Sequence, residues 1–176
     1  KEPMLKDGEV EWRDGPTESL DKEVLATVET PFKPDGGVSV LEGNLGRAVF
    51  KTSALPEPQC VIKAPAVVFE DQFDLDAAFK EGKLDKDCIV VVRFQGPSAI
   101  GMPELHRLTP PLGVLQDKGY KVALVTDGRM SGASGKVPAA IHVTPEAFKG
   151  GLLAKVEEGD IIELNTETGA LSLLVD

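Results

Sequence analysis

Five polar or charged side chains fall within ten positions of one glycine-rich stretch of the chain. Asp127, Arg129, Ser131, Ser134 and Lys136 supply one carboxylate, two cations and two hydroxyls. The three glycines among them let the backbone adopt positive φ and approach a ligand closely. Such a stretch could form a nest of N–H groups for an anion. On local chemistry alone, the same pattern is also typical of a structural turn.

The elements around this stretch suggest where it lies in a fold. An apolar run at residues 122–125 directly precedes it and predicts a buried strand, and α/β folds usually build their sites where such strands end. A second polar loop, residues 101–104, lies beyond the apolar run 88–94, which is typical of a strand buried on both faces. A third, residues 43–47, follows an alternating strand at 38–41 and is by itself typical of a hairpin turn.

The rest of the chain reads as short strands with two or three helices. Apolar residues on one face predict a helix near residues 75–79, which Asp71 or Asp74 can cap. Proline at a first helical position predicts two more helices, after Thr109 and after Thr144. Further strands are expected at residues 25–29, 48–51, 60–62, 66–69, 139–143, 161–164 and 171–175. This mixture predicts an α/β domain with substantial β content.

Composition and charge exclude several classes of function. With 41% hydrophobic and 27% charged residues, the 176-residue chain has the composition of an ordinary soluble globular domain. A formal net charge of −10 argues against nucleic acid as a partner, because a phosphate backbone needs clustered lysine and arginine. No apolar stretch approaches the roughly 18 residues of a transmembrane helix. We therefore expect a cytoplasmic protein that binds neither nucleic acid nor membrane.

The first residues and the two cysteines bear on the domain organisation and on metal binding. Residues 1–23 are charged and poor in apolar side chains, which predicts a leader or interdomain connector ahead of a domain at 24–176. They lack the apolar core of a signal peptide, and the missing initiator methionine is consistent with a processed or excised chain. Cys60 and Cys88 match no metal-ligand spacing, and Cys88 opens an apolar run in which a buried free thiol is expected.

Three of the loops together resemble the dihydroxy-acid and 6-phosphogluconate dehydratase family. Residues 124–134 resemble its Thr-Asp-Gly-Arg-x-Ser-Gly signature, and residues 43–45 and 101–104 resemble two further family blocks in the same order. The similarity covers most of residues 38–176. Within it, residues 130–140 are closest to the sugar-acid branch rather than the branched-chain one. The resemblance implies a swivelling β/β/α-type α/β domain, with a mixed sheet of barrel-like β content and a few short helices.

The resemblance also implies a reaction and its cofactors. Family members are hydro-lyases, in which a proton leaves C2 of a 2,3-dihydroxy acid, hydroxide leaves C3 and the enol becomes a 2-keto acid. For the sugar-acid branch, 6-phospho-D-gluconate becomes 2-dehydro-3-deoxy-6-phospho-D-gluconate in the Entner–Doudoroff pathway. The family uses Mg²⁺ and an iron–sulfur cluster held by cysteines of a larger N-terminal part. The isolated chain is thus expected to be an inactive half of the site, completed by that N-terminal domain in a homodimer.

The same resemblance assigns roles to single residues. Ser131 is the expected base, working as an alkoxide, and Glu104 is the expected Mg²⁺ ligand, since hard cations take carboxylate oxygens. Arg129 is expected to favour the serine anion and, with Ser134 and Lys136, to bind the substrate. The structural alternatives are a turn hydroxyl for Ser131 and a glutamate at a helix start for Glu104.

Three other polar side chains are expected to be structural. Asp127 is expected to brace its loop rather than bind metal. His106 and His142 have no partner at metal-ligand spacing. Two alternative functions stay open, namely dehydration of another sugar acid or of a branched 2,3-dihydroxy acid, and a non-catalytic interface module whose loops dock a partner.

Overall fold

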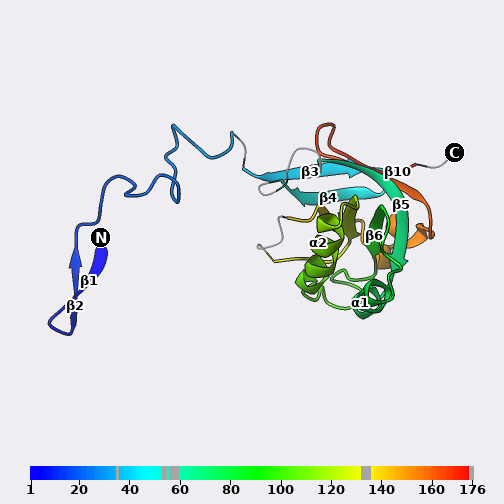
Figure 1. Cartoon of the computed structure of the whole chain (residues 1–176), viewed down its shortest axis with the longest axis horizontal. Helices are drawn as coiled ribbons and strands as arrows, with labels where there is room; N and C mark the ends of the chain where they lie inside the picture. The colour runs from blue at the N-terminus through cyan, green and yellow to red at the C-terminus, as the bar shows by residue number, and fades with distance from the viewer. Residues whose placement is uncertain (35, 53–54, 56–59, 132–135, 175–176) are drawn as a thin grey trace. The chain divides into compact units, whose positions relative to one another are not determined.

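Two compact units make up the chain, Lys1–Gly36 and Gly37–Asp176 (Figure 1). The computed structural model describes residues 1–34, 36–52, 55, 60–131 and 136–174. Each unit is described below by itself.

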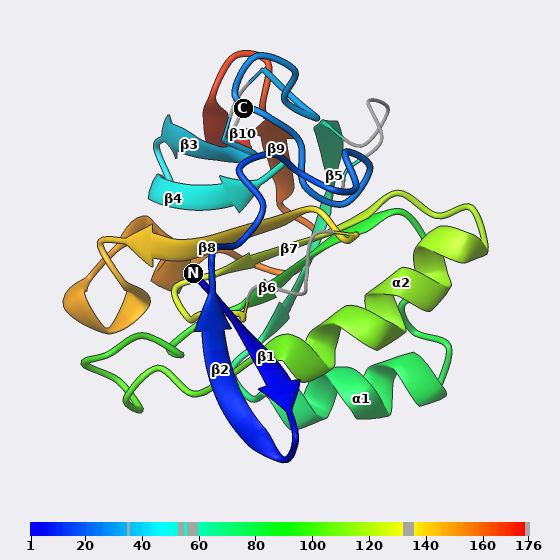
Figure 2. The same cartoon turned by 90° about the vertical axis from the view of Figure 1, so that its left-hand side faces the viewer.

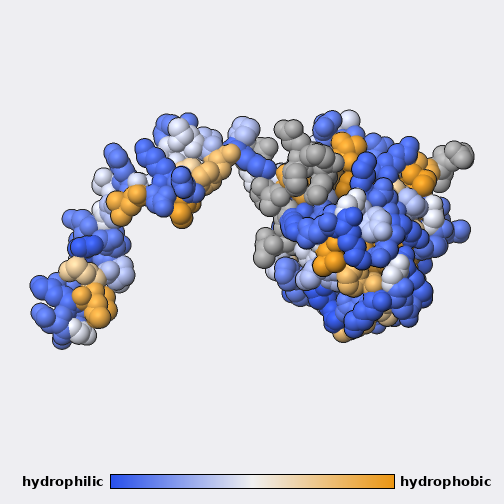
Figure 3. All heavy atoms as spheres, in the orientation of Figure 1, coloured by the Kyte–Doolittle hydropathy of each residue, from blue (hydrophilic) through white to orange (hydrophobic). Residues whose placement is uncertain are grey.

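The first unit contains a two-stranded antiparallel hairpin of β1 (Glu2–Lys6) and β2 (Glu9–Arg13). These strands were not expected from such a charged segment. The strand predicted at residues 25–29 is wrong, because no neighbouring strand pairs with this segment among the described residues and Val28 is 91% exposed. Apolar side chains lie at the surface of this unit (Figure 3). The large ones are Leu5, Val10, Trp12, Leu20, Val24, Leu25, Val28 and Phe32.

Strands of the second unit close into a barrel (Figures 1 and 2). In spatial order they are β10 (Ala170–Leu174), β3 (Val38–Gly43), β4 (Gly46–Lys51), β8 (Ala139–Thr144), β7 (Val122–Thr126), β6 (Cys88–Val92), β5 (Val61–Phe69) and β9 (Ile161–Asn165). Strands β5, β6, β7 and β8 are parallel neighbours, and the remaining pairs are antiparallel except β10 with β3. The predicted mixed α/β fold with barrel-like β content is confirmed.

Strands β6 and β7 are buried on both faces, as their continuous apolar sequence predicts. Successive side chains of a strand point to opposite faces, so each strand serves two cores. Ile89 and Val125 belong to the core inside the barrel, whereas Val90 and Leu124 belong to the core between the barrel and the helices. The edge where these two strands end is therefore held rigidly from both sides.

Helices α1 (Gln72–Lys80) and α2 (Thr109–Asp117) lie on the same side of β6 and β7 (Figure 2). The Asp71 carboxylate caps α1 by accepting from the Phe73 N–H at 2.8 Å, and α2 has proline in its first turn, so both predicted helices are confirmed. The inward leucines are Leu75, Leu108, Leu112 and Leu115. None of the helices that the structure describes is long and apolar enough to cross a membrane.

Short 3₁₀ turns complete the unit. The turn η2 (His106–Leu108) leads into α2, while η3 (Ala147–Lys149) and η4 (Leu152–Lys155) follow β8. The α-helix expected after Thr144 is therefore replaced by two 3₁₀ turns. Gly150, in the left-handed conformation at φ 85°, ends the first of them.

The barrel closes where β3 meets β10, and backbone pairing there is minimal. Only Ala170 and Glu42 are in register. Beyond them, the Asn44 side chain makes the hydrogen bonds that a strand backbone would otherwise make. Its Oδ1 accepts from the Leu173 N–H and its Nδ2 donates to the Leu173 carbonyl, both at 2.7 Å. The β3 backbone comes so close to β10 that a Cβ on Gly43 would collide with a β10 carbonyl. The polar loop at residues 43–47 is thus a hairpin turn that also helps to close the barrel.

Candidate functional site

Two loops that are far apart in sequence meet at the edge where β6 and β7 end. An isolated parallel bridge pairs Glu104 with Arg129, and the Leu105 N–H donates to the Arg129 carbonyl at 3.1 Å. Parallel strands end at the same edge of a sheet, which is why the loops after them come together. The structure therefore joins the Glu104 block to the loop that carries Arg129 and Ser131.

Asp127, the residue after β7, holds the segments at this edge together by hydrogen bonds. Its side chain is buried, with Oδ1 accepting from the Gln95 N–H and Oδ2 from the Ala147 N–H, both at 2.9 Å. These donors belong to the segments that follow β6 and β8, so one carboxylate ties three segments together. An ionised carboxylate can only accept hydrogen bonds, and both oxygens are used in this way. The bracing role predicted for Asp127 agrees with these bonds.

Gly128 is required by the crowding next to Asp127. A Cβ at this position would lie 2.6 Å from Leu105 Cδ1 and 2.8 Å from Gln95 Cβ, distances that real Cβ atoms do not reach. The Gly128 carbonyl also accepts from the His142 N–H at 3.0 Å. Any side chain at position 128 would push the two loops apart.

The carboxylate of Glu104 is the centre of the site. Its Oε1 accepts from the N–H groups of Ser131 and His106, each at 2.9 Å, and its Oε2 accepts from Arg129 Nη1 at 2.8 Å. Burial by itself would raise the pKa of Glu104, but the two N–H groups and the charge of Arg129 outweigh it and hold the pKa below its usual range. Glu104 is therefore an anion at neutral pH.

Arg129 is held between two acceptors of the opposite loop. Its Nε donates to the Met102 carbonyl at 3.0 Å, and its Nη1 donates to Glu104. The planar guanidinium suits this two-point contact. Half of the side chain remains exposed, so Arg129 presents positive charge at the surface of the site.

Ser131 lies next to Glu104 and is fixed on both sides of its backbone. Its N–H donates to Glu104 Oε1, and its carbonyl accepts from Lys51 Nζ at 3.0 Å. Its side chain is exposed. Lys51 comes from β4, 80 positions earlier in the chain. Sequence reasoning missed this lysine, since nothing in its local sequence points to the distant loop.

The structure does not link the other two predicted substrate-binding residues to this centre. Ser134 lies outside the described residues. Lys136 is exposed, and its Nζ lies 3.0 Å and 3.3 Å from the carboxylate oxygens of Asp117 at the end of α2. Within the described residues, Lys136 makes no hydrogen bond to Glu104 or Ser131. Its role in substrate binding stays a prediction.

A pocket of about 340 Å³ lies beside the site. It is lined by Pro97, Met102, Asp127, His142, Val143, Thr144, Pro145, Glu146 and Lys149. Met102 connects it to the site, because the Met102 carbonyl accepts from Arg129.

His142 lines this pocket with an exposed side chain, and its expected structural role stays a prediction. It has a left-handed φ of 57° and lies where the pairing of β4 with β8 shifts register. Phe94 and Met102 near the same edge also have positive φ, at 59° each. Such strained backbone often gathers at functional sites.

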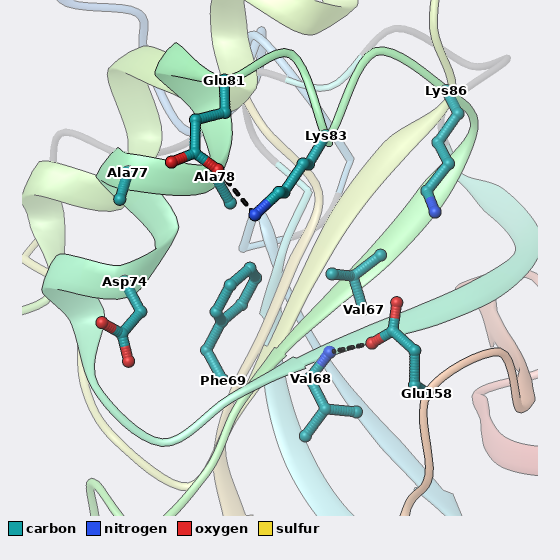
Figure 4. Close-up of a pocket in the computed structure, with 10 residues that line it drawn as sticks. All are labelled: Val67, Val68, Phe69, Asp74, Ala77, Ala78, Glu81, Lys83, Lys86 and Glu158. Carbon is teal, nitrogen blue, oxygen red and sulfur yellow. Dashed lines mark hydrogen bonds and ion pairs between the residues drawn. The ribbon is translucent and has the colours of Figure 1, made fainter.

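A larger pocket, of about 610 Å³, lies between β5 and α1 (Figure 4). Three of its charged side chains make protein contacts, since Lys83 Nζ pairs with Glu81 at 2.6 Å and Glu158 accepts from the Val68 N–H at 2.9 Å. Of the described residues that line it, none is a serine, histidine or cysteine. The loops around Glu104 are therefore the better candidate for chemistry.

The residues present fit the two expected cofactors, Mg²⁺ and the iron–sulfur cluster, differently. Among the described residues, no three His, Cys, Asp or Glu side chains gather as a metal site. Glu104 could give a carboxylate oxygen to a cation that other groups also bind. Cys88 does not fit a cluster ligand, because ligation needs a thiolate and burial raises the pKa of the Cys88 thiol to about 11. Cys60 is half-buried.

Comparison with known proteins gives a consistent match. Residues 23–176 match the family described as "Dihydroxy-acid/6-phosphogluconate dehydratase C-terminal". The phosphogluconate dehydratase of Escherichia coli K12 is 66% identical over 175 residues, which are 99% of this chain and 29% of that protein. That of Pseudomonas aeruginosa is 58% identical over 176 residues, 100% of this chain and 29% of the relative. The dihydroxy-acid dehydratase of Ruminiclostridium cellulolyticum is 36% identical over 159 residues, 88% of this chain and 28% of the relative.

Proposed function

We propose that this chain, which belongs to the dihydroxy-acid/6-phosphogluconate dehydratase family, supplies part of the active site of a hydro-lyase acting on 6-phosphogluconate. The chain spans about 29% of the length of the phosphogluconate dehydratases it matches, so the complete activity needs the rest of the enzyme. The observation that carries the proposal is that Ser131 and Arg129 both donate to the Glu104 carboxylate. The backbone of Ser131, the proposed base, is thus hydrogen-bonded directly to Glu104, the proposed cation ligand.

The proposed reaction is the removal of water across C2 and C3. The C2–H bond breaks and its proton goes to the Ser131 alkoxide, which becomes a neutral hydroxyl. The electron pair of that bond forms the C2=C3 double bond, the C3–O bond breaks, and the leaving hydroxide takes a proton from solvent to become water. The Ser131 hydroxyl gives the C2 proton back to solvent, which restores the alkoxide. The enol then becomes the 2-keto acid. A serine hydroxyl can be such a base only where neighbouring positive charge favours its anion, and Arg129 supplies some of that charge.

Glu104 fits a Mg²⁺ ligand. Hard cations take carboxylate oxygens and usually need few of them from the protein. Its Oε2 holds a single hydrogen bond, from Arg129, and so keeps a lone pair for a cation. When bound, the cation would supply Lewis acidity that stabilises negative charge on the substrate. The remaining ligands would come from substrate, water or other parts of the enzyme.

The other expected parts of the site remain our proposals. We assign no ligand of the iron–sulfur cluster to this chain and propose that they lie in the N-terminal part of the same enzyme, in a homodimer. Arg129, Ser134 and Lys136 are the proposed substrate-binding residues. Lys136 would have to exchange Asp117 for the phosphate of the substrate.

The decisive experiment is Ser131→Ala in the complete enzyme, with Ser39→Ala on β3 as a matched control. Proton transfer by a positioned group contributes about 10²–10⁴-fold, so kcat should fall by at least that factor. KM should persist, because the ground-state contacts remain. Exchange of the C2 hydrogen with solvent should also be lost, since this exchange needs the base but not the departure of hydroxide.

The outcome also separates the alternatives. Measuring 6-phosphogluconate, an unphosphorylated sugar acid and a branched 2,3-dihydroxy acid in parallel identifies the substrate class. If Ser131→Ala keeps the kcat of the control, Ser131 is a turn residue and the proposal fails. In that case the loops are better described as an interface module.

A further inference from the structure

Lys51 makes a contact that the proposed reaction does not yet use. It is the last residue of β4, where it pairs with Val38 of β3, and its side chain is half-buried. Its Nζ donates to the carbonyl of Ser131 at 3.0 Å. A hydrogen bond from an ammonium group is stronger than one between neutral groups. A side chain of the barrel strand β4 thus contacts the loop at Ser131, the residue proposed as the base.

The contact completes a clamp on the peptide backbone of Ser131. On one side, the N–H of Ser131 donates to the anionic Glu104 at 2.9 Å, and on the other its carbonyl accepts from Lys51. The side chain that carries the hydroxyl is attached to the Cα atom between these two fixed points. A proton acceptor must be held within a fraction of an ångström of its productive position, and such a clamp provides that.

The neighbouring charges leave Lys51 available for this contact. Glu104 forms its ion pair with Arg129. Lys51 makes no ion pair in the part of the chain that the structure describes, so no described carboxylate draws its Nζ away from the Ser131 carbonyl.

We propose that Lys51 is a positioning residue for Ser131, which holds the loop at the Ser131 carbonyl and so fixes the place of the hydroxyl that acts as the base. The inference rests on the proposed function of Ser131. Lys51 acts through Ser131 and does not exchange a proton with the substrate.

The clamp can be tested on this chain without any turnover. Lys51→Met keeps the length of the side chain but removes its charge and its donors. Lys63→Met on β5, an exposed lysine away from this loop, is the matched control. Amide hydrogen exchange at Ser131, followed by NMR, should become about tenfold faster in Lys51→Met, because losing a charge-assisted hydrogen bond changes an opening equilibrium by that order. The control should exchange like the wild type.

The effect on the base is measured in the complete enzyme. Lys51→Met should lower kcat about tenfold with little change in KM, because a displaced base weakens proton transfer while the ground-state contacts remain. Lys51→Arg, which keeps the charge and the donors, should restore most of kcat. Lys63→Met should leave both kcat and KM unchanged.

The results distinguish this inference from the proposed function. If Ser131→Ala is inactive while Lys51→Met matches its control in amide exchange and kcat, the inference about Lys51 is wrong and the proposed base stands. If Lys51→Met loses activity that Lys51→Arg does not restore, and its urea midpoint falls well below that of Lys63→Met, Lys51 serves stability and the inference is also wrong. Faster Ser131 exchange in Lys51→Met, together with a kcat that Lys51→Arg restores, supports it.

Discussion

Asp127 offers a demanding test of how the edge of the barrel is assembled. Asp127→Asn keeps the shape of the side chain but replaces one acceptor oxygen with an NH₂ group. That group would face a backbone N–H, of either Gln95 or Ala147, which now bonds to carboxylate at 2.9 Å. One charge-assisted hydrogen bond is lost, and a buried donor is left without an acceptor.

The size of the effect follows from these contacts. A hydrogen bond to a charged group contributes about 1.5–3 kcal/mol, and leaving a buried partner unsatisfied adds to the loss, so we expect about 3 kcal/mol of destabilisation. With a urea dependence of about 2 kcal/mol per molar, the unfolding midpoint should fall by about 1.5 M. The control is Asp85→Asn, whose carboxylate meets Lys118 Nζ at 3.1 Å on the surface. Such exposed pairs contribute at most about 1 kcal/mol.

The assay has to report on the barrel alone. The single tryptophan, Trp12, lies in the Lys1–Gly36 unit, so its fluorescence would follow the wrong part of the chain. Far-ultraviolet circular dichroism during urea unfolding follows the strands and helices of Gly37–Asp176 instead. If Asp127→Asn lowers the midpoint no more than Asp85→Asn does, the idea that this carboxylate holds three segments together is refuted.

Two further predictions concern titratable groups. The pKa of Glu104 is lowered on folding from its usual 4.5, so the stability it contributes is present above that pH and is lost as the pH falls through the folded value. The difference in Tm between wild type and Glu104→Gln should therefore shrink below pH 4.5, and a constant difference would contradict the hydrogen bonds described. Burial raises the pKa of the Cys88 thiol to about 11, so at pH 8 iodoacetamide should alkylate Cys60 first and Cys88 only after urea is added. Equal labelling of the two in the folded chain would show that Cys88 is accessible.

Local sequence patterns predicted most elements of the barrel unit because each pattern depends on near neighbours. The apolar runs of β6 and β7 and the cap of α1 by Asp71 need no knowledge of the rest of the chain. The same reasoning failed at residues 25–29, where strand-forming side chains have no strand to pair with among the residues that the structure describes. A strand needs its partner's N–H and C=O groups, and composition alone does not supply them.

The site was predicted only as a set of residue types. The resemblance predicted that Glu104, Arg129 and Ser131 serve the same reaction. The structure shows that Arg129 and the Ser131 N–H both donate hydrogen bonds to Glu104. Lys51 could not be found in this way, because it reaches Ser131 only through the curvature of the closed barrel. His142 was assigned a structural role because it has no partner at metal-ligand spacing, and its place at a shift of register could not be predicted, since register is a property of pairing between strands.

The seam between β3 and β10 has a consequence for how this protein behaves in a crowded solution. A closed barrel offers no free strand edge to other molecules, whereas an open one exposes unpaired N–H and C=O groups that template aggregation. Here the last part of the closure depends on one side chain, since the amide of Asn44 bonds to both backbone groups of Leu173 as a neighbouring strand would. By occupying these backbone groups, Asn44 also makes them less available for pairing with a strand of another molecule. It does so at the junction of β3 with β10, where the register pair is Ala170 and Glu42.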